Sequence, residues 1–261
     1  MSPTAGAAAA VVIHVFGLFH PKTVDVAPGA PGQAIEVRCP AATVRLEGAQ
    51  SMPLQPGCTA RGVFTLSIPG KIRRTFAGNL RTEPGLTVLV EMDLEQAVAS
   101  VVAAELPANT PPAALEAQAI AARSYYVAAL SRGRHAYSAF CDTTHCQHIR
   151  GVLPPDHPAF KAARKTKGLI LEYEGRPVAA MYSASCQGLR ESGPLPNSEL
   201  DYPYFSVPCA YCRRNPSKTK GLLHKRGLCQ AGSADLARQG RDAKGILAHY
   251  YPGTRLRIWA R

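Results

Sequence analysis

The change of hydrophobic period at Asp93 constrains the fold more than any other feature of this sequence. Before Asp93, short runs rich in β-branched residues are separated by Gly and Pro, a pattern that indicates strands and turns. After it, apolar residues recur at the three- and four-residue spacing of an amphipathic helix. The expected strands lie within residues 11–19 and over residues 34–38, 42–46, 62–68, 72–76 and 86–90.

Two helices should follow this change of period. Asp93 and Gln96 have the spacing of a capping box, so the first helix is expected over residues 94–105, where Pro107 stops it. A threonine followed by two prolines marks the start of the second helix, over residues 112–131.

The C-terminal half mixes both kinds of element. Strands are expected at residues 168–173, 178–183 and 256–259, and helices near residues 233–238 and 243–250. The sequence therefore predicts an α+β protein. A β-rich N-terminal region over residues 1–85 should precede a mixed helix and sheet core over residues 86–261.

The charge of the chain favours an anionic partner. Thirty Lys and Arg residues against 18 Asp and Glu give a net charge of +12. Helix-turn-helix, zinc-finger and RNA-binding signatures are absent, so we expect a wall polymer or a membrane surface rather than nucleic acid. The apolar run at residues 5–19 lacks a basic start and is interrupted by His14, so it gives no clear signal peptide. No stretch is long and apolar enough to predict a membrane span.

Glu105 is the first candidate for chemistry. It lies one turn beyond Val101 and Val102 on the apolar stripe of the first helix, so its carboxylate should face the interior or a cleft wall. Burial raises the pKa of a carboxyl group, which suits a general acid near neutral pH. The alternative is a helix-end Glu that turns to solvent or pairs with Arg123. On the second helix, Gln118 and Arg123 are either planar donors for a carbohydrate or part of a solvated face.

The segment Cys-Asp-Thr-Thr-His-Cys-Gln, which begins at Cys141, is the most specific local pattern. Cys141, His145 and Cys146, with His135 one loop upstream, could supply four ligands to a tetrahedral zinc ion. A disulfide between the two cysteines has equal weight at this point. A Cys/His nucleophile pair is disfavoured, because adjacent side chains on an extended segment point to opposite faces.

The remaining cysteines leave several pairings open. Cys39 and Cys58 suit a structural disulfide or two inert buried thiols. Cys209 and Cys212 form a CxxC without a second CxxC at zinc-finger spacing, so they are a weak metal motif. They could also form a disulfide or add ligands to a metal. Their other candidate disulfide partners are Cys186 and Cys229.

Six blocks of sequence occur in an order and spacing typical of one protein family. They are residues 101–107, 114–125, 141–147, 181–188, 221–230 and 246–254. In these blocks the sequence resembles the stage II sporulation protein D family, also called SpoIID/LytB, from about Gly70 onward. Cys229 departs from the family's usual Ser, and Lys225 and Arg226 replace its small residues.

The resemblance implies a SpoIID-like catalytic core with Glu105 as a single catalytic carboxylate. Such an enzyme is a lytic transglycosylase that cuts peptidoglycan, preferably strands stripped of stem peptides, and leaves 1,6-anhydro ends. The resemblance also implies zinc near Cys141 and a location in the cell envelope or outside the cell. A non-catalytic wall-binding protein that stimulates an amidase is the alternative. The candidate glycan-binding residues are Arg123, Gln118, Gln147, Ser185, His224 and Gln230.

Overall fold

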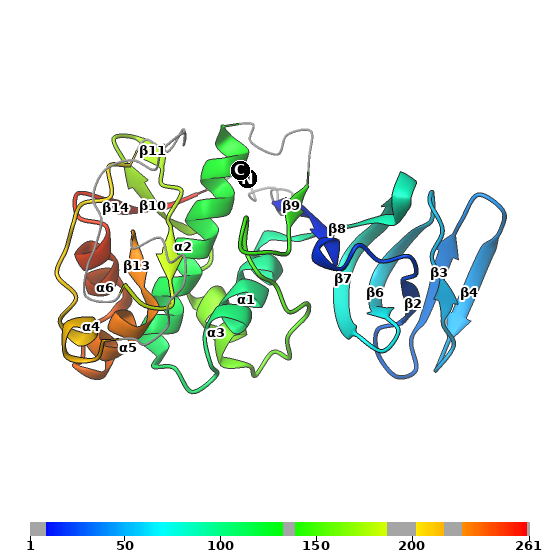
Figure 1. The fold of residues 1–261 in the computed structure, drawn as a ribbon, viewed down its shortest axis with the longest axis horizontal. Helices are drawn as coiled ribbons and strands as arrows, with labels where there is room; N and C mark the ends of the chain where they lie inside the picture. Colours follow the sequence, from blue (N-terminus) through cyan, green and yellow to red (C-terminus); the bar gives the residue numbers. More distant parts are fainter. Residues whose placement is uncertain (1–8, 133–138, 187–201, 217–225, 260–261) are drawn as a thin grey trace, which may run out of the picture. The chain divides into compact units, whose positions relative to one another are not determined.

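The computed structural model of the chain describes residues 9–132, 139–186, 202–216 and 226–259. These residues form two compact units. The first unit comprises residues 1–100 and 135–154, and the second comprises residues 101–134 and 155–260. Both contain regular secondary structure, with strands in the first and helices and strands in the second, which confirms the α+β class (Figure 1).

A nine-stranded sheet forms the first unit. Its main order is β4-β3-β6-β7-β8-β1-β9, and β2 pairs with both β5 and β6. All pairs are antiparallel except β1 with β9. The strands are β1 Ala10–Val15, β2 Asp25–Pro28, β3 Ala34–Arg38, β4 Thr43–Glu47, β5 Met52–Pro53, β6 Thr59–Ile68, β7 Ile72–Glu83, β8 Thr87–Asp93 and β9 Phe140–Cys141.

The interior of this sheet is aromatic and tightly packed. Phe64 and Phe76 face each other across β6 and β7, with ring centroids 6.4 Å apart, and both are fully buried. Gly78 has a φ of 146°, and a Cβ there would lie 2.0 Å from the Glu91 carbonyl oxygen, so this close approach of β7 to β8 requires glycine. A Cys39–Cys58 disulfide joins the end of β3 to the start of β6, which decides between the two alternatives for these cysteines.

The compact units divide the chain at different places from the expected boundary at residue 85. That boundary falls between β7 and β8, which pair directly, with Asn79 opposite Glu91 and Glu83 opposite Thr87. Because β8 completes the N-terminal sheet, the first unit extends to Ser100. It also takes in β9, which pairs with β1.

A long central helix organises the second unit. Helix α2, Pro112–Ser131, packs against α3, β10, α5 and α6 (Figure 1). It is buried almost all round, as expected for a helix at the centre of a unit. Around it lie a three-stranded sheet, β11-β10-β14, and a parallel pair, β12 and β13. The other elements are α3 Pro158–Lys165, β10 Leu169–Tyr173, β11 Arg176–Pro177, β12 Tyr182–Ser183, α4 Ala210–Arg214, β13 Leu228–Cys229, α5 Gln230–Arg238, α6 Ala243–Tyr250 and β14 Arg255–Ile258.

Helix α1, Leu94–Glu105, begins in the first unit and ends in the second. Its bounds and those of α2 confirm the prediction from the sequence, and the Asp93 carboxylate accepts hydrogen bonds from the amides of Glu95 and Gln96. The first strand ends earlier than residue 19, because Phe16 adopts the left-handed region with a φ of 63°. In the described part of the chain, no helix is both long and apolar enough to cross a membrane.

Candidate active site and cysteine groups

Glu105 lies at the C-terminal end of α1 and is partly exposed. Its Oε2 accepts a hydrogen bond of 2.9 Å from the side-chain amide of Gln230. Gln230 is the first residue of α5 and is 5% exposed, so the amide is held inside the second unit. A neutral donor therefore fixes one carboxylate oxygen and leaves the other available for proton exchange with a ligand.

Gln118 on α2 joins this pair. It is fully buried, and its Oε1 lies 3.5 Å from the same Gln230 nitrogen. Its own Nε2 is buried without a hydrogen-bond partner among the described residues. A buried donor left unpaired is costly and rare in folded proteins. The second unit thus brings together Glu105, Gln118 and Gln230.

Tyr182 on β12 also belongs to this site. Burial raises the pKa of its hydroxyl well above the usual value, and the negative charge of Glu105 raises it further. Tyr182 therefore stays a neutral O–H group at any physiological pH. Tyr182 was not among the residues predicted from the sequence, although it lies in the block at residues 181–188 that resembles the SpoIID/LytB family.

Arg123 has a different environment from the one expected for a glycan-binding residue. The side chain is fully buried, and its guanidinium donates to the carbonyl oxygens of Ala163 and Leu169, both at 3.1 Å. Thr166 Oγ1 lies 3.5 Å away. Arg123 thus joins α2 to the end of α3 and the start of β10, which makes it part of the interior of the second unit.

Ser185 and Gln147 are two further candidate glycan-binding residues in the described structure. Ser185 is partly exposed, and its hydroxyl lies 3.4 Å from the Cys212 sulfur. Gln147 is 2% exposed and belongs to the first unit. His224, like the candidate metal ligand His135, lies outside the described residues.

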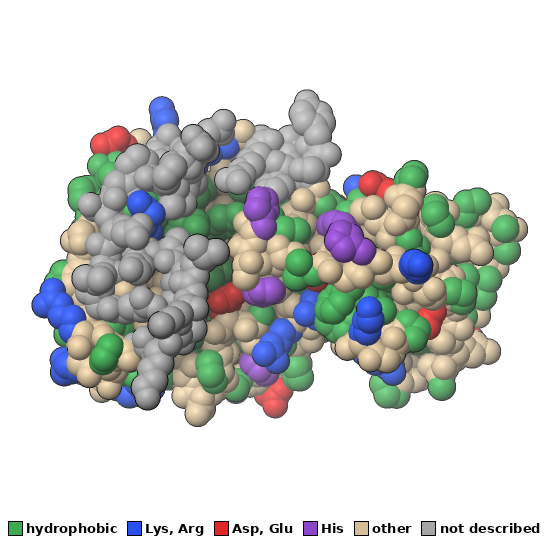
Figure 2. All heavy atoms as spheres, viewed as in Figure 1, with side chains coloured by type: hydrophobic (Ala, Val, Ile, Leu, Met, Phe, Trp, Pro, Cys, Tyr) green, Lys and Arg blue, Asp and Glu red, His purple; other side chains and the backbone are tan. Residues whose placement is uncertain are grey.

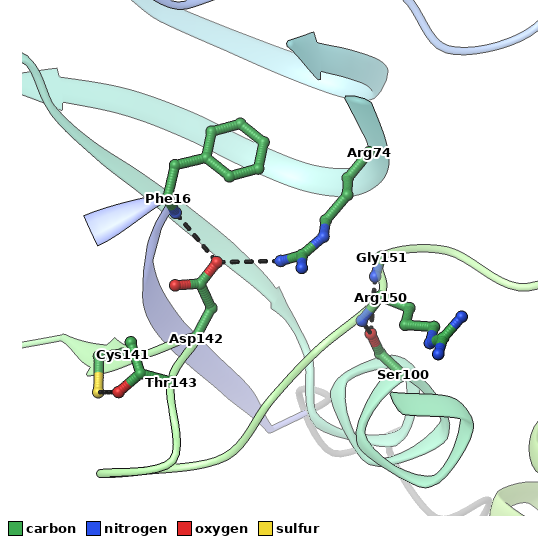
Figure 3. Close-up of polar contacts among 8 residues, drawn as sticks. All are labelled: Phe16, Arg74, Ser100, Cys141, Asp142, Thr143, Arg150 and Gly151. Carbon is green, nitrogen blue, oxygen red and sulfur yellow. Dashed lines mark hydrogen bonds and ion pairs between the residues drawn. The ribbon is translucent and has the colours of Figure 1, made fainter. Parts of the chain in front are cut away.

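The segment around Cys141 is fixed to the sheet of the first unit by Asp142 (Figure 3). One carboxylate oxygen of Asp142 accepts from the Phe16 amide and from Arg74 Nη1, both at 3.0 Å. Asp142 is 5% exposed, so this ion pair is well shielded from water. Burial lowers the pKa of the Arg74 guanidinium, and the Asp142 charge acts against that shift.

A second attachment holds the end of the same segment. The Ser100 hydroxyl oxygen accepts hydrogen bonds from the amides of Arg150 and Gly151, both at 2.8 Å (Figure 3). Ser100 is fully buried in α1. The segment from Cys141 to Gly151 is therefore held by protein groups at both ends.

Three potential metal ligands lie along this segment, and we call them the loop thiol group: Cys141, His145 and Cys146. Their ligand atoms all lie within 4.8 Å of one another, and neither thiol is in a disulfide. His145 Nδ1 is 3.7 Å from the Cys141 sulfur and 3.5 Å from the Cys146 sulfur. Zinc–ligand distances of about 2.3 Å to sulfur and 2.0–2.1 Å to nitrogen place the two atoms about 3.6 Å apart in a tetrahedral site. The donors and their spacing therefore fit a metal ion.

A second group of potential metal ligands consists of four thiols, whose grouping the sequence left open. We call it the buried thiol cluster: Cys186, Cys209, Cys212 and Cys229. All four are buried and none is in a disulfide, and their sulfur atoms lie within 4.8 Å of one another. The CxxC that appeared isolated in sequence thus has two further cysteines beside it.

Residues 82–173 match the family model described as SpoIID, Stage II sporulation protein. This part of the chain is therefore similar to the SpoIID domain. The matched range includes Glu105, Gln118 and Arg123 as well as the loop thiol group, which confirms the family resemblance. A comparison with curated proteins found no match. The SpoIID domain supports a role related to sporulation or the cell wall.

The surface charge agrees with that role. On the coloured part of the face shown in Figure 2, Lys and Arg side chains are scattered among other residues. A dispersed positive charge attracts an extended anionic polymer without offering the shaped basic groove of many nucleic-acid-binding proteins.

Proposed function

We propose that this SpoIID domain protein is a peptidoglycan lytic transglycosylase that acts on glycan strands in the cell envelope, with peptide-stripped strands as its preferred substrate. The observation that carries the proposal is the Glu105 carboxylate, with one oxygen held by Gln230 and the other available. Gln118 lies buried beside them and belongs to the same polar group.

Glu105 performs both proton transfers in this proposal. Most glycosidases use two carboxylates. A lytic transglycosylase needs one, because the C6 hydroxyl of N-acetylmuramic acid attacks its own C1 in place of water. Glu105 first protonates the oxygen that bridges to N-acetylglucosamine, and this bond to C1 breaks. The resulting carboxylate then accepts the C6 hydroxyl proton as the 1,6-anhydro ring closes.

Neutral groups next to Glu105 position its carboxylate for these proton transfers. The Gln230 amide fixes Glu105 Oε2, so the proton is exchanged at Oε1. Gln118, which is fully buried, lies beside the same Gln230 nitrogen and supports its position. Tyr182, neutral because burial raises its pKa, provides a further O–H group without adding charge next to the carboxylate. Arg123 contributes by holding α2, which carries Gln118.

The loop thiol group suits zinc, because two thiolates and an imidazole are typical ligands of that ion. A bound zinc ion would cross-link the loop that carries Cys141 and Cys146. In this proposal it shapes the loop, and no proton transfer depends on it.

Product analysis tests the proposal. Purified full-length protein is incubated with peptide-free glycan strands, and the new ends are identified by mass spectrometry. We expect 1,6-anhydro-N-acetylmuramic acid ends. New reducing ends would mean hydrolysis and would overturn the transglycosylase mechanism. Binding without cleavage, together with stimulation of an added amidase, would favour the wall-binding alternative.

A further inference from the structure

The buried thiol cluster comes from three separate segments of the second unit. Cys186 follows β12, Cys209 caps the start of α4, Cys212 lies within α4, and Cys229 ends β13. Each is at most 2% exposed. Four thiols converging from separate segments on one buried point indicate a common function.

The geometry of the cluster fits one tetrahedral ion. With Zn–S bonds of about 2.3 Å, neighbouring sulfurs in a four-thiolate site lie about 3.8 Å apart. The Cys212 and Cys229 sulfurs are 3.5 Å apart, and all pairs lie within 4.8 Å. A disulfide requires about 2.05 Å and joins only two sulfurs, so it does not account for four sulfurs that are mutual neighbours.

Polar groups surround the sulfurs as they do around metal-bound thiolates. The Gly232 amide donates to the Cys229 sulfur at 3.4 Å. The Ser185 hydroxyl lies 3.4 Å from the Cys212 sulfur, and the Tyr250 hydroxyl lies 3.7 Å from the Cys209 sulfur. Hydrogen-bond donors of this kind orient thiolate ligands and stabilise their negative charge.

The backbone also leaves room for the sulfurs. A Cβ on Gly232 would lie 2.7 Å from the Cys209 sulfur and 2.2 Å from the Tyr250 hydroxyl oxygen. Any larger residue would therefore push into the cluster. The first turn of α5 approaches the thiols closely because this position is glycine.

We infer that Cys186, Cys209, Cys212 and Cys229 together bind one zinc ion in a structural site, distinct from the loop thiol group. Four protein ligands complete the tetrahedron and leave no open position, which is typical of structural rather than catalytic zinc. Zinc is favoured over hard cations such as magnesium or calcium because all four donors are thiols.

The site stabilises the position of Gln230. Cys229 directly precedes Gln230, and β13 pairs with β12, with Cys229 opposite Ser183 and Leu228 opposite Tyr182. An ion bound by Cys229 and Cys186 would therefore fix both strands next to Glu105. The metal inference itself rests on the thiols alone and is independent of the proposed catalytic activity.

The test uses full-length protein with Cys141→Ser and Cys146→Ser, which disables the loop thiol group. After purification with zinc and a reductant, followed by removal of loose metal, elemental analysis should give about one zinc per chain. Replacement by cobalt should give the strong thiolate-to-cobalt absorption of a tetrahedral sulfur site. Less than about a tenth of an equivalent in both measurements would overturn the inference.

Two further measurements assign the ion to these four residues. Adding Cys212→Ser to the same background should reduce bound zinc at least fivefold, whereas the matched Cys39→Ser and Cys58→Ser change should leave it intact. If the Cys212 variant does not fold, alkylation of the background protein decides. The four cysteines should resist alkylation until a strong chelator is added. Rapid alkylation with zinc present, or recovery of these cysteines as disulfides from reductant-treated protein, would contradict a metal site.

Discussion

The loop thiol group and the buried thiol cluster could both hold a metal, but they are built differently. The loop group comes from six consecutive residues, its histidine is exposed, and the surrounding segment is fixed to the first unit by Asp142 and Ser100. The buried cluster is assembled from residues 43 positions apart and is completely enclosed in the second unit. A metal ion in the loop thiol group should change only the conformation of a loop that other contacts already hold. A metal ion in the buried thiol cluster should stabilise the whole second unit.

Removal of metal should give the largest contrast between the two groups. Because the buried cluster links β12, α4 and β13, its loss of zinc should lower the melting temperature by more than about 10 °C. Loss of metal from the loop group should change it by less than about 3 °C. Calorimetry of the wild type and of the Cys141→Ser, Cys146→Ser variant, each with and without a strong chelator, measures both. Equal shifts in melting temperature on metal loss from the two groups would contradict this difference between them.

The Asp142→Asn substitution should have a smaller effect and tests what holds the loop. It preserves an acceptor for the Phe16 amide but removes the charge that faces Arg74. Since Asp142 is buried and Arg74 is partly exposed, we expect the substitution to lower the free energy of unfolding by about 2 kcal/mol. Denaturant unfolding gives the value, with Cys141→Ser as the control. A larger loss in the Cys141 variant would mean that the thiol group, and not Asp142, holds the segment.

The sequence predicted one group and not the other for a physical reason. Cys141, His145 and Cys146 are near neighbours in the chain, so any compact turn brings them together. Cys186 and Cys229 reach the CxxC only through the pairing of β12 with β13, a tertiary contact that no local pattern encodes. The same holds for the candidate active site, where Glu105 was predicted from its place on the helix stripe but its contact with Gln230, 125 residues away, required the fold.

Local elements were predicted more fully than their surroundings. The bounds of α1 and α2 follow from their caps, prolines and period. The burial of Arg123 does not follow from the sequence, because an arginine next to two tyrosines on a helix is equally consistent with a solvated face or a glycan-binding face. Its partners on α3 and β10 lie about 40 residues further along the chain.

An acid titration should show the smallest effect and isolates a contribution in the second unit that needs no metal. Hydrogen bonds from Arg257 and Arg255 lower the pKa of the buried Glu172 carboxyl below its usual range. A lowered folded-state pKa adds stability above the unfolded value of about 4.3, and that stability is lost as the pH falls through the lower folded value. Both arginines are exposed, so we expect the ion pairs of Glu172 to add about 1 kcal/mol to the free energy of unfolding.

Metal-depleted wild type and Glu172→Gln should therefore differ in stability at pH 6 and converge below about pH 4. A difference that persists unchanged at pH 3 would rule out the ion pair as its cause. Zinc-loaded protein serves as the control, because the Glu172 contribution should be the same whether or not the thiol cluster holds an ion.

The most direct test of the central claim is the turnover of peptide-free glycan by Glu105→Gln, compared with wild type. The substitution is nearly isosteric but can neither donate nor accept the required proton, so we predict a loss of at least about a hundredfold with glycan binding and melting temperature retained. Glu95→Gln, the same change at the other end of α1, is the matched control and should retain activity. Turnover of Glu105→Gln within about threefold of wild type would contradict the assignment of Glu105 as the acid and base.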